Sequence, residues 1–184
     1  MARIPLFPLD TMTEEQRKVY EAVVRGPRGV VVGPLRAALH RPELADKWQQ
    51  FGEILRYRTS LPPRLSELAI LAVARHWTSQ LELQQHAPAA LKGGLAKEIV
   101  DAIREGKRPT FAKEDEAAVF DFSFELQNSR LVSDKTYQRT FGFVGVQGIV
   151  ELTALIGYYT MVAMTLVAHE VPLPEGARPE LPPT

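Results

Sequence analysis

Residues 67–95 of this chain, ELAILAVARHWTSQLELQQHAPAALKGGL, decide its fold. Apolar side chains fill most positions of the first half, which is typical of a helix buried in the middle of a domain. Two consecutive prolines precede it and suit a first helical turn, so a helix is predicted over about residues 64–77. A second helix is predicted over about residues 79–91, because the Lys-Gly-Gly sequence that follows is a common C-terminal signal. The stretch therefore predicts two helices joined by a short turn.

Three ionisable side chains in this stretch are candidates for chemistry. At 100° per residue, Glu82 and His86 fall on one helical face together with Ser79. Glu67 lies in the most apolar part of the preceding helix, where an unpaired carboxylate costs several kcal/mol. We therefore expect Glu67 to find a partner on the second helix. A carboxylate oriented onto an imidazole fixes its tautomer and raises its basicity, as a general base requires.

The same residues allow a plainer interpretation. A Glu and a His four positions apart on a helix are usually a solvated surface pair. The apolar surroundings of Glu67 favour a functional site instead, and so does Pro88, which follows His86 by two residues and could kink the helix there. From the residues alone, both interpretations stay open.

Helical periodicity and capping signals recur along the rest of the chain, and no β-alternation of useful length appears beyond residues 29–33. The sequence therefore predicts an all-α fold in a single domain over residues 1–184, with an extended N-terminal arm (1–12) and a proline-rich C-terminal tail (171–184). The further helices are predicted over about residues 13–25, 35–40, 43–57, 96–105, 113–130, 133–143 and 145–169.

Composition excludes several classes of function. The 184 residues are 45% hydrophobic and 24% charged, with a formal net charge of zero, which predicts no attraction to nucleic acid. The absence of cysteine excludes disulfides and thiol chemistry within the chain. The first ten residues have no apolar signal region, so a cytoplasmic protein is expected. Residues 148–168 approach membrane-span length, but their Glu, Thr and Tyr side chains favour a fully buried helix, and no membrane association is expected.

The central stretch resembles the motif of the carboxymuconolactone decarboxylase and alkylhydroperoxidase D-like superfamily. In the redox branch of that family a Glu is followed, after eleven residues, by Cys-x-x-Cys and then, after three more, by a His. The matching positions here are Glu67, Ser79, Glu82 and His86, without a gap. Both cysteine positions are replaced, so the thiol peroxidase cycle is excluded on chemical grounds. The chain is more similar to the decarboxylase branch, which typically lacks the cysteine pair.

The likeness extends on both sides of the motif and covers most of residues 34–174. It includes RYRTSLPPRLSELAIL before the motif and VELTALIGYYTMVAMTL, followed by VPLP, near the end. The resemblance implies an alkylhydroperoxidase D-like helical bundle, self-association as a trimer or hexamer, and a C-terminal helix close to the site. It implies no cofactor and no metal. Two carboxylates and a His are able in principle to hold a metal, as in carboxylate-rich helical bundles.

Four further residues are predicted to contact substrate, and three of them, Trp77, Tyr158 and Arg58, have a plainer alternative. Ser79 is expected at the edge of the site, where redox relatives keep a cysteine. Trp77 is a candidate pocket wall, although a Trp beside a helix end is more often packing. Tyr158, paired with Tyr159, is near the site by resemblance, with core packing as the alternative. Arg58 is placed to bind a substrate carboxylate, although solvated arginines beside turns are commoner.

These observations predict a cofactor-independent lyase that resembles carboxymuconolactone decarboxylases. Its substrate is expected to be a small carboxylated lactone or a related product of aromatic-ring breakdown, whose own conjugated carbonyl accepts the electrons. His86 is predicted to move the proton, Glu67 to orient His86, and Glu82 to supply a second acid or base or to tune His86. The alternative is a non-catalytic family member that binds a small molecule or serves in assembly.

Overall fold

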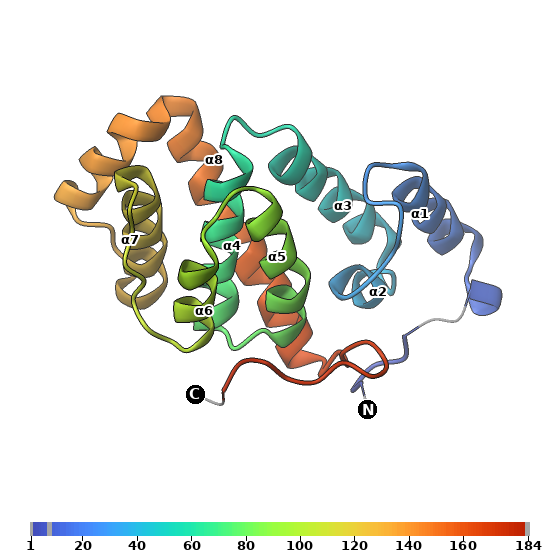
Figure 1. The fold of residues 1–184 in the computed structure, drawn as a ribbon. Coiled ribbons are helices and arrows are strands. Elements are labelled where there is room, and N and C mark those ends of the chain that lie inside the picture. Colours follow the sequence, from blue (N-terminus) through green and yellow to red (C-terminus); the bar gives the residue numbers. More distant parts are fainter. Residues whose placement is uncertain (1, 7–8, 183–184) are drawn as a thin grey trace. The chain divides into compact units, whose positions relative to one another are not determined.

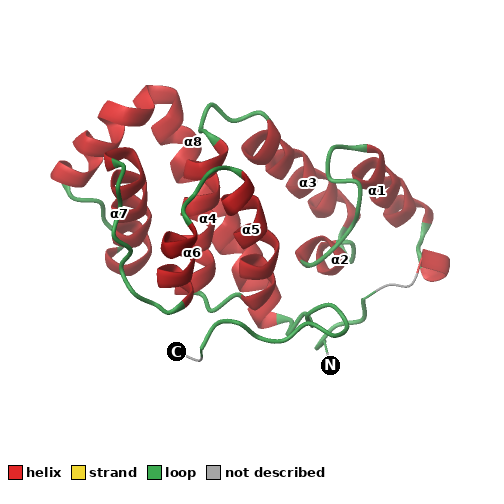
Figure 2. Cartoon of the chain, viewed as in Figure 1, coloured by secondary structure: helices red, strands yellow, loops and turns green. Residues whose placement is uncertain are grey.

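The computed structural model describes residues 2–6 and 9–182, which form helices joined by loops (Figures 1 and 2). Helices make up 68% of the chain, and the described residues contain no strand, so the predicted all-α fold is confirmed. The helices are α1 (Glu14–Arg25), α2 (Pro34–Ala38), α3 (Pro42–Tyr57), α4 (Pro63–His76), α5 (Gln80–Lys92), α6 (Lys97–Arg104), α7 (Glu114–Ser129) and α8 (Asp134–Ala168).

The helix starts follow from local sequence. At α1, the Thr13 hydroxyl accepts a hydrogen bond from the Gln16 backbone N–H, while the Gln16 side chain accepts one from the Thr13 N–H. This is the capping box that the Thr-Glu-Glu-Gln sequence predicts. Helix α4 begins with Pro63 in its first turn, where a proline loses no intrahelical hydrogen bond. Ser133 caps α8 by accepting from the Thr136 N–H.

The chain divides into two compact units. One comprises Met1–Arg58 and Met164–Pro172, and the other comprises Thr59–Ala163 and Leu173–Thr184. All of the residues in the 67–95 motif lie in the second unit. The single domain predicted over residues 1–184 stays a prediction, because compactness alone does not tell whether the units fold separately.

Helix α4 forms the core of the second unit. It packs between α5 and α7 and also contacts α6 (Figure 1). Its apolar side chains lie on most of its circumference, and Leu68, Leu71 and Val73 are fully buried. This agrees with the buried helix that the sequence predicts, and it means that any polar group on α4 is held among packed side chains.

Helix α8 changes direction at Gly145, whose φ of 67° and ψ of −174° are not helical. Glycine has no Cβ, so it adopts this positive φ without strain. The break lies where the sequence predicts one helix to end and the next to begin. By length and composition α8 is the one helix in the described chain that is able to cross a membrane, and half of its most apolar window is buried. The expectation of full burial is therefore wrong: Val146 and Val150 are 68% and 63% exposed, because the unit packs on only one side of the helix.

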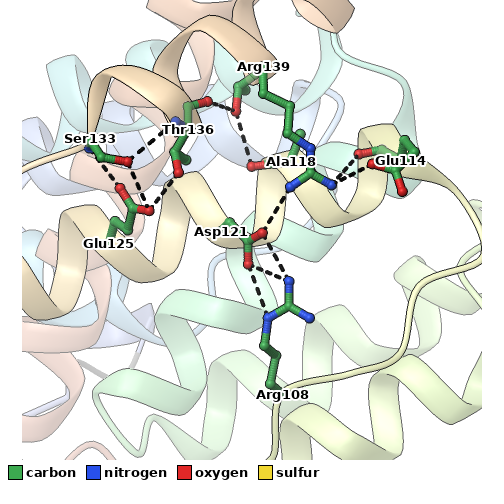
Figure 3. A network of polar contacts seen from close by, with 9 residues as sticks. Arg108, Glu114, Ala118, Asp121, Glu125, Ser133, Thr136 and Arg139 are labelled. Carbon is green, nitrogen blue, oxygen red and sulfur yellow. Dashed lines mark hydrogen bonds and ion pairs between the residues drawn. The ribbon is translucent and has the colours of Figure 1, made fainter.

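A polar network joins α7 to the first part of α8 (Figure 3). The Glu125 carboxylate accepts from the Ser133 backbone N–H at 2.7 Å and from the Thr136 hydroxyl at 2.6 Å. One turn earlier on α7, Asp121 accepts from Arg108 at 2.8 Å and from Arg139 at 3.1 Å. These contacts fix the turn between the two helices, so the network has a structural role.

The C-terminal tail packs against its own unit. The Gln80 amide donates to the Leu181 carbonyl at 2.8 Å and accepts from the backbone N–H groups of Glu180 and Leu181. The Arg104 guanidinium pairs with the Glu180 carboxylate at 3.0 Å, and the Leu181 side chain is buried. In the N-terminal arm, the Arg3 backbone N–H donates to the His169 carbonyl. Residues 1, 7–8 and 183–184 of the two predicted segments lie outside the described residues.

Candidate active site

A tight turn places α4 and α5 side by side. Only residues 77–79 separate the two helices, and Thr78 has a left-handed φ of 49°. The Ser79 backbone N–H donates to the Ala74 carbonyl at 2.8 Å, which closes the turn. The chain therefore returns along α4, and the start of α4 lies beside the middle of α5.

This return brings Glu67 and His86 together. The Nδ1 of His86 lies 2.6 Å from the Oε2 of Glu67, which is the contact expected from the sequence. The side chains of His86 and Glu67 are only 4% and 14% exposed, so the pair is largely shielded from water. With Glu67 ionised, its oxygen only accepts, so Nδ1 must carry the hydrogen and Nε2 is left as an acceptor. The pair thus has the tautomer and orientation that a general base requires.

The ring of Tyr159, on α8, packs edge-on against His86, with 4.9 Å between ring centroids. Tyr158, which the sequence singles out, is buried and contacts the Tyr159 ring at 5.3 Å. The aromatic ring that packs on the imidazole is thus that of Tyr159, the neighbour of the tyrosine predicted from the sequence. Adjacent residues point about 100° apart on a helix, and the sequence contains no signal that tells which of the two faces α5.

Glu82 and Ser79 are buried at the start of α5, each with 2% exposure. Neither oxygen of the Glu82 carboxylate has a hydrogen-bond partner among the described residues, and the same holds for the Ser79 hydroxyl. Burial raises the pKa of Glu82 to about 8, and the nearby Ser79 hydroxyl, which lowers it, offsets only part of this effect. Near neutral pH, Glu82 is therefore mostly a protonated acid, and it lies one helical turn before His86.

Trp77 and Arg58 make other contacts. The indole N–H of Trp77 donates to the Gln127 side chain at 3.3 Å, and Gln127 in turn donates to the Thr160 hydroxyl at 2.6 Å. Trp77 thus connects α4, α7 and α8 at the end of α4. Arg58 belongs to the other compact unit, where it is largely exposed and pairs with Glu53 at 3.6 Å. The hydrogen bond described for Trp77 goes to Gln127 and not to His86, Glu67 or Glu82.

The arrangement is suited to proton transfer. It combines an oriented imidazole with a nearby carboxylic acid whose environment keeps it protonated, and such divergent pKa values often separate acid and base roles in enzymes. Within the described part of the chain, no group of three or more His, Asp or Glu side chains is arranged to hold a metal ion. Pro88 lies inside α5 without ending it, so the helix that presents both groups is continuous.

Comparisons with known proteins agree with this fold. Residues 42–123 match a family model described as the carboxymuconolactone decarboxylase family. A peroxidase-related protein from Silicibacter sp. TM1040, itself uncharacterized, has a similar structure, with a TM-score of 0.72 and 16% identity over 92% of this chain and 90% of that one. No curated protein matches the sequence.

Two further solved structures are similar. An uncharacterized peroxidase-related protein with an alkylhydroperoxidase AhpD core, from Ralstonia eutropha JMP134, has a TM-score of 0.76 and 13% identity over 95% of this chain and 93% of its own. A Cys→Ala variant of the debrominase Bmp8, in complex with 2,3,4-tribromopyrrole, has a TM-score of 0.74 and 14% identity over 95% and 92% of the two chains. At such identities the likeness shows a shared fold and no shared substrate.

Proposed function

We propose that this chain, whose residues 42–123 match the carboxymuconolactone decarboxylase family model, is a cofactor-independent lyase that removes the carboxylate of a small carboxylated lactone or a related acid. The observation that supports this proposal best is the 2.6 Å contact between His86 and Glu67 one helical turn from the buried Glu82. A small-molecule substrate and a cytoplasmic location belong to the same proposal.

The proposed chemistry asks little of the protein beyond position and proton transfer. In a substrate that carries its carboxylate on a saturated carbon next to a carbonyl, or next to a C=C bond conjugated to one, the C–C bond breaks, CO₂ leaves and the electron pair moves into the carbonyl to form an enolate or dienolate. A proton must then reach carbon. Glu82 is the proposed donor, because its raised pKa keeps it protonated at neutral pH. The Nε2 of His86 is the proposed second proton carrier, held in place by Glu67.

Thiol chemistry is not available to this site. The two positions that carry cysteine in the redox pattern are Ser79 and Glu82, and the chain has no cysteine elsewhere. A serine hydroxyl does not replace a thiolate in peroxide reduction, and a carboxylate cannot form a disulfide. The exchange of a thiol for a buried carboxylic acid favours acid–base chemistry at the same place in the fold.

The proposal is tested by incubating the protein with a panel of carboxylated lactones and muconate-type acids and measuring CO₂ release. His86→Ala should abolish turnover, and Glu67→Gln should lower it by about 10²–10⁴-fold while keeping the shape of the side chain. His169→Ala is the control, because His169 lies outside the motif and should be dispensable. Full turnover by His86→Ala on a substrate of the native protein would contradict the proposal.

The non-catalytic alternative predicts a different pattern. Some of these acids should then raise the melting temperature of the native protein without any release of CO₂. Thermal shifts that survive in Glu67→Gln, combined with no turnover by the native chain, would favour a binding protein over a lyase.

A further inference from the structure

A pocket of about 240 Å³ lies where the end of α4 meets α6, the following loop and α7. Ala72, Arg75 and His76 contribute from α4, and none of Glu67, Glu82 and His86 is among the lining residues. The pocket is therefore distinct from the proposed active site.

One wall of this pocket is aromatic and apolar. The rings of Phe120 and Phe124 stack with 6.1 Å between centroids and an interplanar angle of 19°. Ile103 adds a buried aliphatic side chain, whereas Phe124 is 55% exposed at the mouth. Such a wall favours a flat apolar group, because ring stacking adds to the burial of apolar surface.

The Arg75 guanidinium gives the pocket a positively charged group beside this apolar wall. Its Nε is buried and has no hydrogen-bond acceptor among the described residues, and its Nη1 donates a long hydrogen bond of 3.4 Å to the Thr78 hydroxyl. No carboxylate of the described chain pairs with it. The other two long cations of the lining are each compensated, Arg108 by Asp121 at 2.8 Å and Lys107 by Glu105 at 2.7 Å.

Gly106 leaves room for this guanidinium. Gly106 has a φ of 74°, and a Cβ built there would lie 2.9 Å from the Nη2 of Arg75. The absence of a side chain at Gly106 thus lets the guanidinium lie directly against the loop. An arginine without a carboxylate partner keeps its charge and its planar set of N–H donors available for an anion.

We infer that this pocket binds a small planar monocarboxylate of the benzoate class, with its carboxylate on Arg75 and its ring against Phe120 and Phe124. Arginine pairs with carboxylates through parallel hydrogen bonds, and the aromatic wall accommodates the ring. A cavity of roughly 150 Å³ holds benzene, so about 240 Å³ has room for one ring and a carboxylate. This inference goes beyond the proposed lyase activity and does not depend on it.

The test titrates the full chain with benzoate, and separately with its neutral analogue benzamide, by calorimetry and saturation-transfer NMR. Benzoate should bind about tenfold more tightly than benzamide, because only the carboxylate makes a charge-assisted pair. Arg75→Met should weaken benzoate binding about tenfold and leave benzamide binding unchanged. Phe124→Ala, at an exposed position that the fold does not need, should weaken both ligands.

Two controls make the result specific. Arg25→Met removes an equally long but exposed cation from α1 and should leave benzoate binding unchanged. His86→Ala should also leave it unchanged, which separates this pocket from the proposed active site. The inference is overturned if benzoate does not bind the native chain in the millimolar range, or if Arg75→Met binds it normally. Loss of binding in His86→Ala alone would place the ligand at the other site.

Discussion

Glu82 is the residue whose charge state matters most for both stability and chemistry. Its folded pKa of about 8 lies above the ordinary value of 4.5, because burial penalises the carboxylate. Between these two pH values the unfolded chain ionises at Glu82 while the folded chain holds the proton. The unfolded state therefore binds fewer protons, and stability falls as the pH rises from about 4.5 to about 8.

This dependence predicts that Glu82→Gln becomes more stable than the native chain as the pH rises. The amide stays neutral at every pH, so the two proteins should be similar near pH 5 and differ most above pH 8. At 1.36 kcal/mol per pKa unit, the gain is at most about 5 kcal/mol. Urea unfolding at the two pH values measures it.

Glu98→Gln changes an exposed carboxylate and serves as the control, since it should leave the free energy of unfolding unchanged at both pH values. If Glu82→Gln shows no stabilisation at high pH, the side chain is not buried as an acid, and its proposed role as proton donor fails with it. In the CO₂ assay the same variant should lose activity, because an amide has no proton to donate to carbon.

At the scale of the elements, Glu151 fixes the entry to the helix that carries Glu67. Its Oε2 on α8 accepts from the Thr59 hydroxyl at 2.8 Å and from the Ser60 N–H and hydroxyl at 2.7 and 2.6 Å. Burial acts to raise the pKa of Glu151, but hydrogen bonds from Ser60, Gln147 and Thr59 outweigh it and lower the pKa to about 2. One carboxylate thus ties the start of α4 to α8.

Glu151→Ala should therefore destabilise the protein by about 1.5–3 kcal/mol at neutral pH, the range for hydrogen bonds to a charged group. Because the folded pKa lies below the unfolded one, the stabilisation is present above about pH 4.5 and is lost as the pH falls toward 2. The difference between variant and native chain should shrink accordingly in acid, as followed by urea unfolding. Glu175→Ala, an exposed carboxylate of the tail, should have no such effect, and an equal loss in both variants would contradict this account.

For the whole molecule, the apolar side chains left exposed on α8 bear on assembly. Phe143, Val146 and Val150 are 52%, 68% and 63% exposed, and the last also lines a shallow depression together with Tyr137 and Ile149. Exposed apolar patches of this kind mark interaction surfaces. We propose that this face of α8 contributes to self-association, as a trimer or hexamer.

The double variant Val146→Lys/Val150→Lys should then shift the protein toward its monomer mass of 20.6 kDa, because burying two ammonium groups in an interface is costly. Light scattering measures the change, and Val30→Lys, an exposed valine of the other unit, is the matched control. A native chain that is already monomeric at micromolar concentration would refute the proposal.

The local sequence of this chain determines where its helices begin and end. The capping box at Thr13, the prolines before α4 and the glycine break at Gly145 each act within a few residues, so their outcome does not depend on distant parts of the chain. The pairing of Glu67 with His86 was also predictable, because a carboxylate within an apolar helix needs a partner and the next helix returns beside it.

Only the tertiary structure decided which side chains meet across helices that are distant in sequence. The contact of Tyr159 with His86 depends on the rotation of α8 about its axis, which the residues around Tyr159 do not determine by themselves. The missing partner of Glu82 and the uncompensated Arg75 are likewise products of packing, because burial removes water without supplying a hydrogen-bond partner. Periodicity tells which face of a helix is apolar, whereas the identity of its neighbours depends on how several such faces fit together.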